Sequence, residues 1–204
     1  MHQGTRDTYN HSAGQLGKHY DEIGPREGDI DLAFAIAGYP ENAVVLEIGC
    51  GNGRDARAIL RHTPFYTGID TSEKMIALAR IKAPKGVFEV ADAVLYDYAG
   101  PYDIVFALAQ FRHMNIEEAA TVLKKVYDSL KPGGVFYISS NYGEQYHQSS
   151  RADSYGLREM YYYNPAIIQQ YAPEGFKKIQ EIHDVVDGNQ WFEIALKKQK
   201  EPQL

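Results

Sequence analysis

The sequence has little of what several classes of protein require. Its single cysteine, Cys50, excludes an internal disulfide and a cysteine-rich zinc site, and no spacing of ligand residues predicts a metal. No apolar run approaches the ~18 residues of a membrane span, and the first residues lack the charged and then apolar pattern of a secretion signal. We therefore expect a cytoplasmic protein that has no membrane partner.

Positive charge is also scarce. The chain holds 21 Lys and Arg against 27 Asp and Glu, which gives a formal net charge of −6, and its basic residues form no long cluster. Binding to a nucleic-acid backbone normally requires a clustered basic face. The composition therefore argues against a nucleic-acid partner.

The chain has enough material for one α/β domain. Its 204 residues, of which 44% are hydrophobic, can bury a full core but are too few for two domains of ordinary size. We expect a single domain over residues 1–204, present as a monomer or a homodimer.

The stretch VVLEIGCGNGRDA, residues 44–56, is the centre of the predicted fold. Residues 44–48 are almost wholly apolar, which is typical of a buried strand in a parallel sheet. Gly49, Gly51 and Gly53 follow at alternate positions, where the chain must turn sharply and bring bare backbone close to another group. The apolar positions after the turn predict a helix, so this unit resembles the beginning of a nucleotide-binding fold.

The glycine spacing bears on which nucleotide is bound. A dinucleotide fingerprint reads G-x-G-x-x-G, but counted from Gly49 the third glycine comes one place early, at Gly53, and Arg54 takes its position. The next apolar run ends at Asp70, whose carboxylate could accept both ribose hydroxyls of either a nicotinamide or a methionine adenosyl cofactor. The glycine spacing therefore argues against an NAD-dependent oxidoreductase, whereas Asp70 is compatible with one.

Three motifs carry a resemblance to one family. The E-x-G-x-G-x-G turn, the segment GIDTSEKMIALAR at 68–80 and the segment LKPGGVFYIS at 130–139 resemble, in order, motifs of class I S-adenosylmethionine-dependent methyltransferases. The resemblance covers residues 43–140 continuously. It implies an α/β fold with a doubly wound, Rossmann-like sheet of seven strands, mostly parallel, which ends in an antiparallel hairpin at 176–197.

The resemblance also implies the cofactor, S-adenosyl-L-methionine, and its product, S-adenosyl-L-homocysteine. Asp92 follows the strand expected at 87–90 and falls where the family has an acid that binds the adenine amine. Cys50 lies inside the glycine turn, where it is a nucleophile or, as we favour, a small residue that fills the turn. The predicted cofactor-binding residues are Glu47, Gly49, Cys50, Gly51, Gly53, Asp70, Thr71, Met75, Asp92, Ala93, Ala107, Tyr9 and Tyr20.

The N-terminal segment, residues 1–25, is polar and aromatic and predicts a loose helix. In the family that the chain resembles, a Tyr-rich segment here folds over the cofactor, which makes Tyr9 and Tyr20 candidate lid residues. A partly ordered surface arm is the alternative.

The segment YDIVFALAQFRHM, residues 102–114, predicts a fourth strand and the loop after it, where an open α/β sheet places its chemistry. It lacks the Asn/Asp-Pro-Pro-Tyr/Phe signature of methyltransferases that act on nucleic-acid or protein nitrogens, and it resembles small-molecule enzymes, including the tellurite-resistance-like group. His113 is a candidate general base, because an unperturbed histidine titrates near neutrality; alternatively, it orients the loop or caps the following helix. Gln110 and Arg112 either contact the substrate, Arg112 through an oxyanion, or lie on the surface.

Residues 141–164 form a tyrosine-rich insertion without periodicity. Tyr142 and Tyr161 are candidate substrate-binding residues in an aromatic wall, or they belong to a loop packed through its rings. The predicted function is in-line methyl transfer to an unidentified small molecule. A non-catalytic S-adenosylmethionine-binding regulatory protein is the other alternative.

Overall fold

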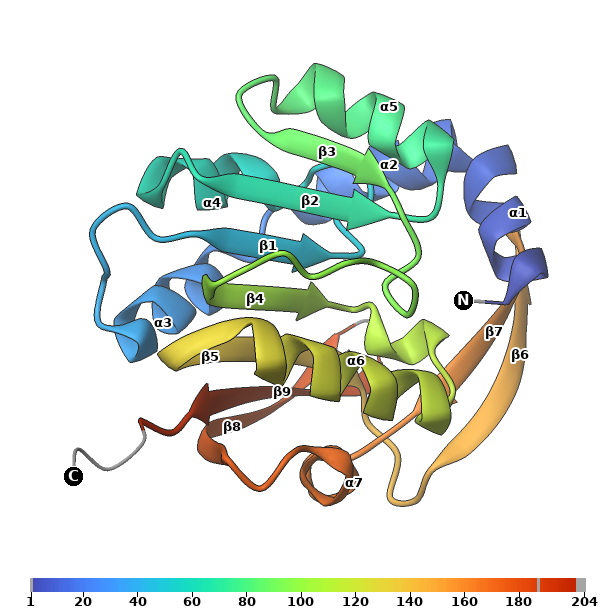
Figure 1. Ribbon diagram of the computed structural model, residues 1–204. Helices are drawn as coiled ribbons and strands as arrows, with labels where there is room; N and C mark the ends of the chain where they lie inside the picture. The colour runs from blue at the N-terminus through green and yellow to red at the C-terminus, as the bar shows by residue number, and fades with distance from the viewer. Residues whose placement is uncertain (1, 187, 201–204) are drawn as a thin grey trace.

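A computed structural model describes residues 2–186 and 188–200, and its centre is a seven-stranded sheet (Figure 1). The sheet order is β3-β2-β1-β4-β5-β9-β8. The strands are β1 (Val45–Ile48), β2 (Tyr66–Asp70), β3 (Val87–Val90), β4 (Tyr102–Leu108), β5 (Leu130–Asn141), β8 (Phe176–Val186) and β9 (Asn189–Lys198). Strands β1 to β5 are parallel, while β9 is antiparallel to both of its neighbours. The predicted fold class is confirmed.

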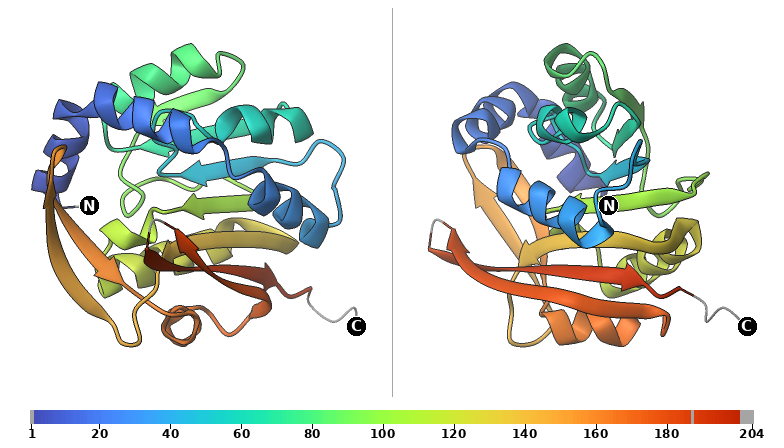
Figure 2. Two further views of the ribbon diagram at one scale, coloured as in Figure 1. Left: turned by 180° about the vertical axis from the view of Figure 1, so that it is seen from behind. Right: turned by 90° about the vertical axis from the view of Figure 1, so that its left-hand side faces the viewer.

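Helices cover both faces of the sheet (Figure 2). On one face α3 (Glu27–Ala37), α4 (Ala56–His62) and α5 (Glu73–Lys82) share an apolar core with β1, β2 and β4. On the other face α6 (Ile116–Ser129) and α7 (Pro165–Tyr171) share a second core with β4, β5 and β9. These two cores make the sheet a rigid support for the loops at its edge.

Helix α6 shows how local sequence fixes an element. Asn115 begins the helix with a capping box, in which its side chain accepts from the Glu118 N–H and the Glu118 carboxylate accepts from the Asn115 N–H. Ala119, Leu123 and Val126 lie on the buried face.

The parallel strands bring the glycine turn and the acid together at one edge. Strand β1 pairs with β2 so that Glu47 lies opposite Gly68 and Ile48 opposite Ile69. The next residues along each strand, Gly49 and Asp70, therefore leave the sheet side by side at the carboxyl edge.

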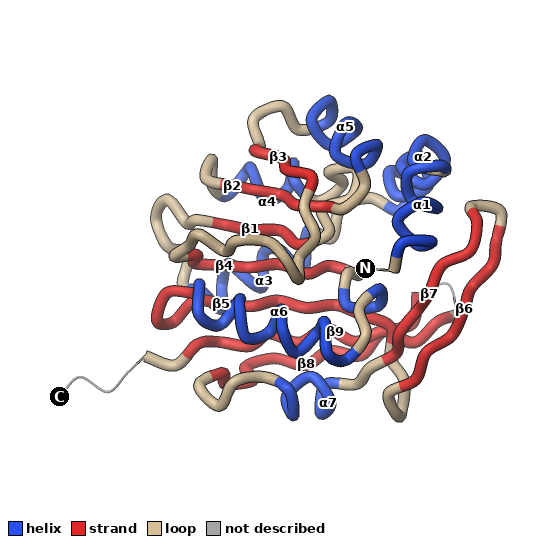
Figure 3. Tube along the Cα trace, turned by 45° about the vertical axis from the view of Figure 1, so that its right-hand side comes forward, coloured by secondary structure: helices blue, strands red, loops and turns tan. Residues whose placement is uncertain are grey.

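The carboxyl edge is covered by two units that are far apart in sequence (Figure 3). The first is α1 (Gln3–His11) with α2 (Ala13–Ile23), and the second is a hairpin of β6 (His147–Asp153) and β7 (Gly156–Tyr162). The sequence predicted a loop over the second segment, but the structure has two paired strands. The reason is that six of the seven β6 residues are exposed, so no alternation of apolar and polar residues marks the strand.

Three hydroxyl side chains of the N-terminal helices join these two units. Thr8 Oγ1 donates to the carbonyl oxygen of Leu157 at 2.6 Å, and Ser12 Oγ donates to that of Tyr155 at 2.6 Å. Thr5 Oγ1 accepts from the N–H of Glu159 at 2.9 Å. The N-terminal segment is therefore two ordered helices that are held against the hairpin.

Candidate functional site

The glycine turn between β1 and α4 has three left-handed positions. Gly49, Gly51 and Gly53 have φ angles of 73°, 54° and 76°, which side chains rarely adopt. A Cβ on Gly53 would lie 3.0 Å from Ala79 Cα, so this glycine allows α5 to pack closely. A Cβ on Gly51 would meet nothing within 4 Å. Gly51 therefore presents bare backbone to open space.

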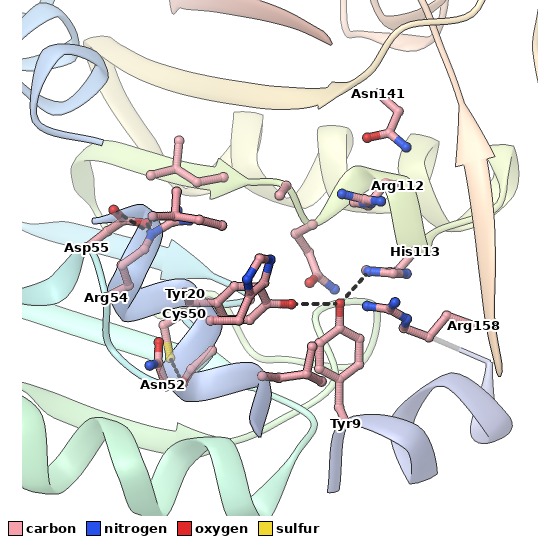
Figure 4. Close-up of a pocket in the computed structure, with 18 of the residues that line it drawn as sticks. Tyr9, Tyr20, Cys50, Asn52, Arg54, Asp55, Arg112, His113, Asn141 and Arg158 are labelled. Atoms are coloured by element: carbon pink, nitrogen blue, oxygen red, sulfur yellow. Dashed lines mark hydrogen bonds and ion pairs between the residues drawn. The ribbon is translucent and has the colours of Figure 1, made fainter. Parts of the chain in front are cut away.

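A cavity of about 280 Å³ opens beside Gly51. Its described walls come from the glycine turn, the ends of β2, β4 and β5, helices α1 and α2, and the two hairpins (Figure 4). Nine of the predicted site residues line it, namely Tyr9, Tyr20, Gly49, Cys50, Gly51, Asp70, Gln110, Arg112 and His113. The cavity thus lies at the carboxyl edge that the strand pattern indicated.

Asp70 supplies a carboxylate at the rim of the cavity. Its oxygens accept from the N–H groups of Gly51 at 3.0 Å and Ser72 at 2.8 Å, which fix its direction. Burial raises the pKa of Asp70 from 3.8 to about 6, although these hydrogen bonds oppose the rise. The carboxylate is ionised at neutral pH and can accept further hydrogen bonds.

Glu47 and Cys50 support the turn, and both are buried. Glu47 is buried and accepts from the Tyr66 hydroxyl at 2.5 Å, and it does not line the cavity. Burial, followed by the charge of Asp55, raises the pKa of Glu47 to about 8. Burial likewise raises the pKa of the Cys50 thiol well above its ordinary value. Cys50 therefore remains a protonated thiol, which is what a residue that fills the turn requires.

Polar residues of the turn hold the N-terminal helices in place. Asn52 Nδ2 donates to the Gly17 carbonyl oxygen and to Asp21 Oδ1, both at 2.9 Å. Asp55 Oδ1 accepts from the Arg26 N–H at 2.8 Å. Sequence reasoning did not single out Asn52 and Asp55, although polar residues beside glycines in such a turn were an available signal.

A chain of hydrogen bonds crosses the cavity from α2 to the loop after β4 (Figure 4). The Tyr20 hydroxyl donates to the Tyr9 hydroxyl at 3.4 Å, and the Tyr9 hydroxyl lies 2.9 Å from His113 Nε2. His113 Nδ1 lies 3.1 Å from the carbonyl oxygen of Glu159. Because a carbonyl only accepts, Nδ1 carries the proton and Nε2 accepts from Tyr9.

The prediction of a general base assumed a His113 pKa near neutrality, but in the structure this pKa is much lower. Burial, and then the positive charge of Arg112, lower this pKa to about 3. Its imidazole is thus neutral at physiological pH, but it is a much weaker base than an exposed histidine.

The predicted substrate residues divide into two groups. Gln110 packs against Gly49, and the Arg112 guanidinium lies 5.0 Å from the centre of the Trp191 ring, with both residues in the cavity wall. Tyr142 and Tyr161 do not line the cavity, because their rings pack elsewhere. Tyr142 meets His183 edge to face, and Tyr161 stacks parallel to Tyr146. Further lining residues come from the insertion predicted at 141–164, although they were not chosen as its binding residues: Asn141, Arg151, Asp153, Tyr155 and Arg158. Arg26 and Trp191 also line the cavity, and sequence reasoning missed both.

Several predicted cofactor residues also lie outside the cavity lining. Met75 is buried among Ala13 and Leu16, where it packs α5 against α2. Asp92 accepts from the Val94 N–H at 2.9 Å within its own loop. Four more predicted cofactor residues do not line the cavity: Gly53, Thr71, Ala93 and Ala107. Gly53 packs on α5, and Thr71 is half-buried after β2. The Ala93 carbonyl accepts from Tyr98, and Ala107 is buried within β4.

Comparison with known protein families gives a match to a methyltransferase domain over residues 45–134. A trans-aconitate 2-methyltransferase of Azoarcus sp. (strain BH72) is 32% identical over 113 residues, which are 53% of this chain and 44% of the relative. A ubiquinone biosynthesis O-methyltransferase of Caulobacter vibrioides is 29% identical over 106 residues, 49% of this chain and 41% of the relative. The chain thus matches less than half the length of these curated relatives.

Solved structures show the same fold at low identity. The magnesium protoporphyrin IX methyltransferase of Synechocystis PCC 6803 with bound S-adenosylhomocysteine has a TM-score of 0.71 and 17% identity, and the match covers 95% of this chain and 98% of that one. An S-adenosylmethionine-dependent methyltransferase of Methanosarcina mazei has a TM-score of 0.69 and 18% identity, and the match covers 82% of this chain and 98% of that one.

Among the described residues no helix is long and apolar enough to cross a membrane.

Proposed function

We propose that this protein, which has the class I methyltransferase fold and matches the methyltransferase domain at residues 45–134, methylates a small molecule with S-adenosylmethionine. The observation that carries the proposal is the rim formed by Gly51 and Asp70. There, bare backbone and an ionised carboxylate face one cavity at the carboxyl edge of a parallel sheet.

The residues at this rim fit the cofactor. When bound, S-adenosylmethionine supplies a methyl group already activated by a positively charged sulfur. Asp70 would bind the two ribose hydroxyls, and the open space at Gly51 would admit the nucleoside against the backbone. Tyr9 and Tyr20 would cover the bound molecule and exclude water from it. Because the donor is activated, the chain contributes chiefly by positioning the two reactants.

His113 takes part in this arrangement through Tyr9. With a pKa of about 3 and its Nε2 occupied by the Tyr9 hydroxyl, the ring serves to position that hydroxyl. The general-base role is the competing hypothesis, and substitution separates the two. The amide of His113→Gln can also accept from Tyr9. If His113 only positions Tyr9, this variant should retain most of kcat/KM. If His113 is a general base, the substitution should lower kcat/KM ~100-fold or more.

A small-molecule acceptor agrees with the relatives, which include a trans-aconitate 2-methyltransferase and an O-methyltransferase of ubiquinone biosynthesis. Membership of the tellurite-resistance-like group and residence in the cytoplasm stay predictions. The predicted adenine contact of Asp92 also stays a proposal, because that side chain lies outside the cavity wall.

Calorimetry and a methyl-transfer assay test the proposed function, and pull-down experiments separate it from a regulatory role. Calorimetry should show micromolar or tighter binding of S-adenosylhomocysteine and no binding of NAD; the reverse result would support the oxidoreductase alternative. Incubation with donor labelled in the methyl group and a broad metabolite panel should give label transfer. Binding without any transfer, together with a stable macromolecular partner in pull-down experiments, would instead support a regulatory protein.

A further inference from the structure

The described walls of the cavity carry more positive charge than the chain as a whole. Five arginines and three aspartates line the cavity, although the protein has a formal net charge of −6. One of the aspartates, Asp70, lies at the rim assigned to the ribose. The excess of guanidinium groups is therefore greatest on the remaining walls.

Most of these arginines have carboxylate partners. Arg54 pairs with Asp55, and Arg26 lies 3.0 Å from Asp29 and 3.5 Å from Glu193. These pairs neutralise the side of the cavity nearest the glycine turn and α3.

The opposite side has fewer carboxylates than arginines. Arg151 and Arg158 share a single carboxylate, that of Asp153. Arg158 is only 7% exposed, and its Nε has no hydrogen-bond partner among the described residues. One negative charge therefore faces two guanidinium groups here.

Arg112 has no carboxylate partner among the described residues. Its contacts include the face of the Trp191 ring and the Met160 sulfur, at 3.8 Å, and within residues 2–186 and 188–200 its buried Nε has no hydrogen-bond partner. Burial, and the nearby charges of Arg158 and Arg151, also act to lower its pKa. A buried guanidinium without a counter-ion is costly, because the desolvation of its charge is not offset.

A third buried group completes the cluster. Asn141, at the end of β5 and 3% exposed, has a side-chain oxygen that accepts from no donor in the part of the chain that the structure describes. Figure 4 shows Asn141, Arg112 and Arg158 on the same side of the Tyr9 hydroxyl, away from Cys50 and Asn52 of the glycine turn. These groups are thus gathered at the end of the cavity where the acceptor must lie if the donor binds at the turn.

We propose that the methyl acceptor carries an oxyanion, a carboxylate or a phosphate group, which the guanidinium groups of Arg112 and Arg158 bind. A hydroxyl or amine of the same molecule would donate to Asn141 Oδ1. This proposal rests on the proposed function, because it assigns the glycine turn to the donor. It names the class of substrate: a small anion with a hydrogen-bond donor close to its charge.

The donor itself offers a competing anion, the carboxylate of its methionine moiety. Comparison of two ligands separates the two cases. S-adenosylhomocysteine has this carboxylate, and 5′-methylthioadenosine lacks it. If Arg112 binds the acceptor, Arg112→Gln leaves the affinity of both ligands unchanged.

The experiment measures binding of chosen anions by calorimetry to the full chain saturated with S-adenosylhomocysteine. Citrate and phenyl phosphate are the anionic probes, and triethyl citrate and phenol are their uncharged counterparts. We expect at least one anion to bind, and the stronger of the two identifies the carboxylate or the phosphate as the preferred group. Arg112→Gln should weaken that binding about 10- to 100-fold, and Arg112→Lys should weaken it less. Arg57→Gln, at an exposed arginine of α4, is the matched control and should have no effect.

Three results would overturn the proposal. The first is that neither anion binds, and the second is that the uncharged counterparts bind equally well. The third is that Arg112→Gln weakens the binding of S-adenosylhomocysteine but not that of 5′-methylthioadenosine. Thermal melts establish that each variant is folded, and Arg112→Lys keeps the test valid if the glutamine variant is not. If the wild type does not bind S-adenosylhomocysteine, the proposed function is contradicted instead. The anions are then titrated into the protein without S-adenosylhomocysteine.

Discussion

Substitution of Asp70 by Asn gives the sharpest test of the donor site. The change keeps the size of the side chain but replaces one carboxylate oxygen by an NH2 group, which donates hydrogen bonds and cannot accept one. In the structure both oxygens are already directed by backbone N–H groups, those of Gly51 and Ser72, so the carboxylate needs no rearrangement to meet a ribose. The loss should therefore appear directly in the affinity for S-adenosylhomocysteine.

The magnitude follows from the kind of hydrogen bond removed. A hydrogen bond to a charged group contributes about 1.5–3 kcal/mol, which corresponds to about a 10- to 150-fold increase in Kd. Calorimetry at pH 7.5 measures this change. Asp128→Asn, at an exposed aspartate on α6, is the control and should leave Kd unchanged. An Asp70→Asn variant that binds as tightly as the wild type would remove the ribose assignment.

The raised pKa of Asp70 adds a dependence on pH. Donor binding requires the ionised carboxylate, so affinity is complete above the folded-state pKa of about 6 and is lost as the pH falls through it. Between pH 7.5 and pH 5 the wild-type affinity should fall about tenfold, whereas that of Asp70→Asn should stay constant. Parallel pH curves for the two proteins would refute this reasoning.

The remaining predictions concern the glycine turn and the hydrogen-bond chain. Gly49→Ala should lower the free energy of unfolding by about 1–2 kcal/mol or more, because φ is 73° and the new Cβ would lie 2.2 Å from Gln110 Oε1. Gly14→Ala, in α2 with nothing within 4 Å of its Cβ, should instead raise it by up to about 1 kcal/mol; thermal or denaturant melts that rank the two alike would contradict this. Tyr9→Phe should cost about 1 kcal/mol of stability and weaken S-adenosylhomocysteine binding, since it leaves His113 Nε2 unpaired; an unchanged melt and an unchanged Kd would show that the bond has no role.

Local patterns in the sequence were enough for the core and the turn. The strand before Gly49, the alternate glycines and the acid at Asp70 follow one another within residues 44–70, and parallel pairing brings them to one edge. The capping box of α6 likewise lies within four residues, Asn115 to Glu118, although we did not single it out in the sequence.

The side of the cavity proposed for the acceptor depends on pairing between distant segments. Asn141 and Trp191 are 50 positions apart in the numbering and face each other only because β9 pairs antiparallel with β5. Arg158 comes from a hairpin whose outer strand is exposed and carries no amphipathic pattern. The low pKa of His113 depends on burial and on neighbouring arginines, neither of which a single sequence displays.

The joint between the N-terminal helices and β7 has a consequence for how this scaffold can diversify. Thr5, Thr8 and Ser12 hold the hairpin only through its main-chain N–H and C=O groups. These hydrogen bonds do not depend on the side chains of β7, so a residue there that lines the cavity, such as Arg158, can be exchanged without removing the bonds that hold the hairpin to the helices. Libraries randomised at inward-facing β7 positions should thus yield altered acceptor repertoires on an otherwise intact protein.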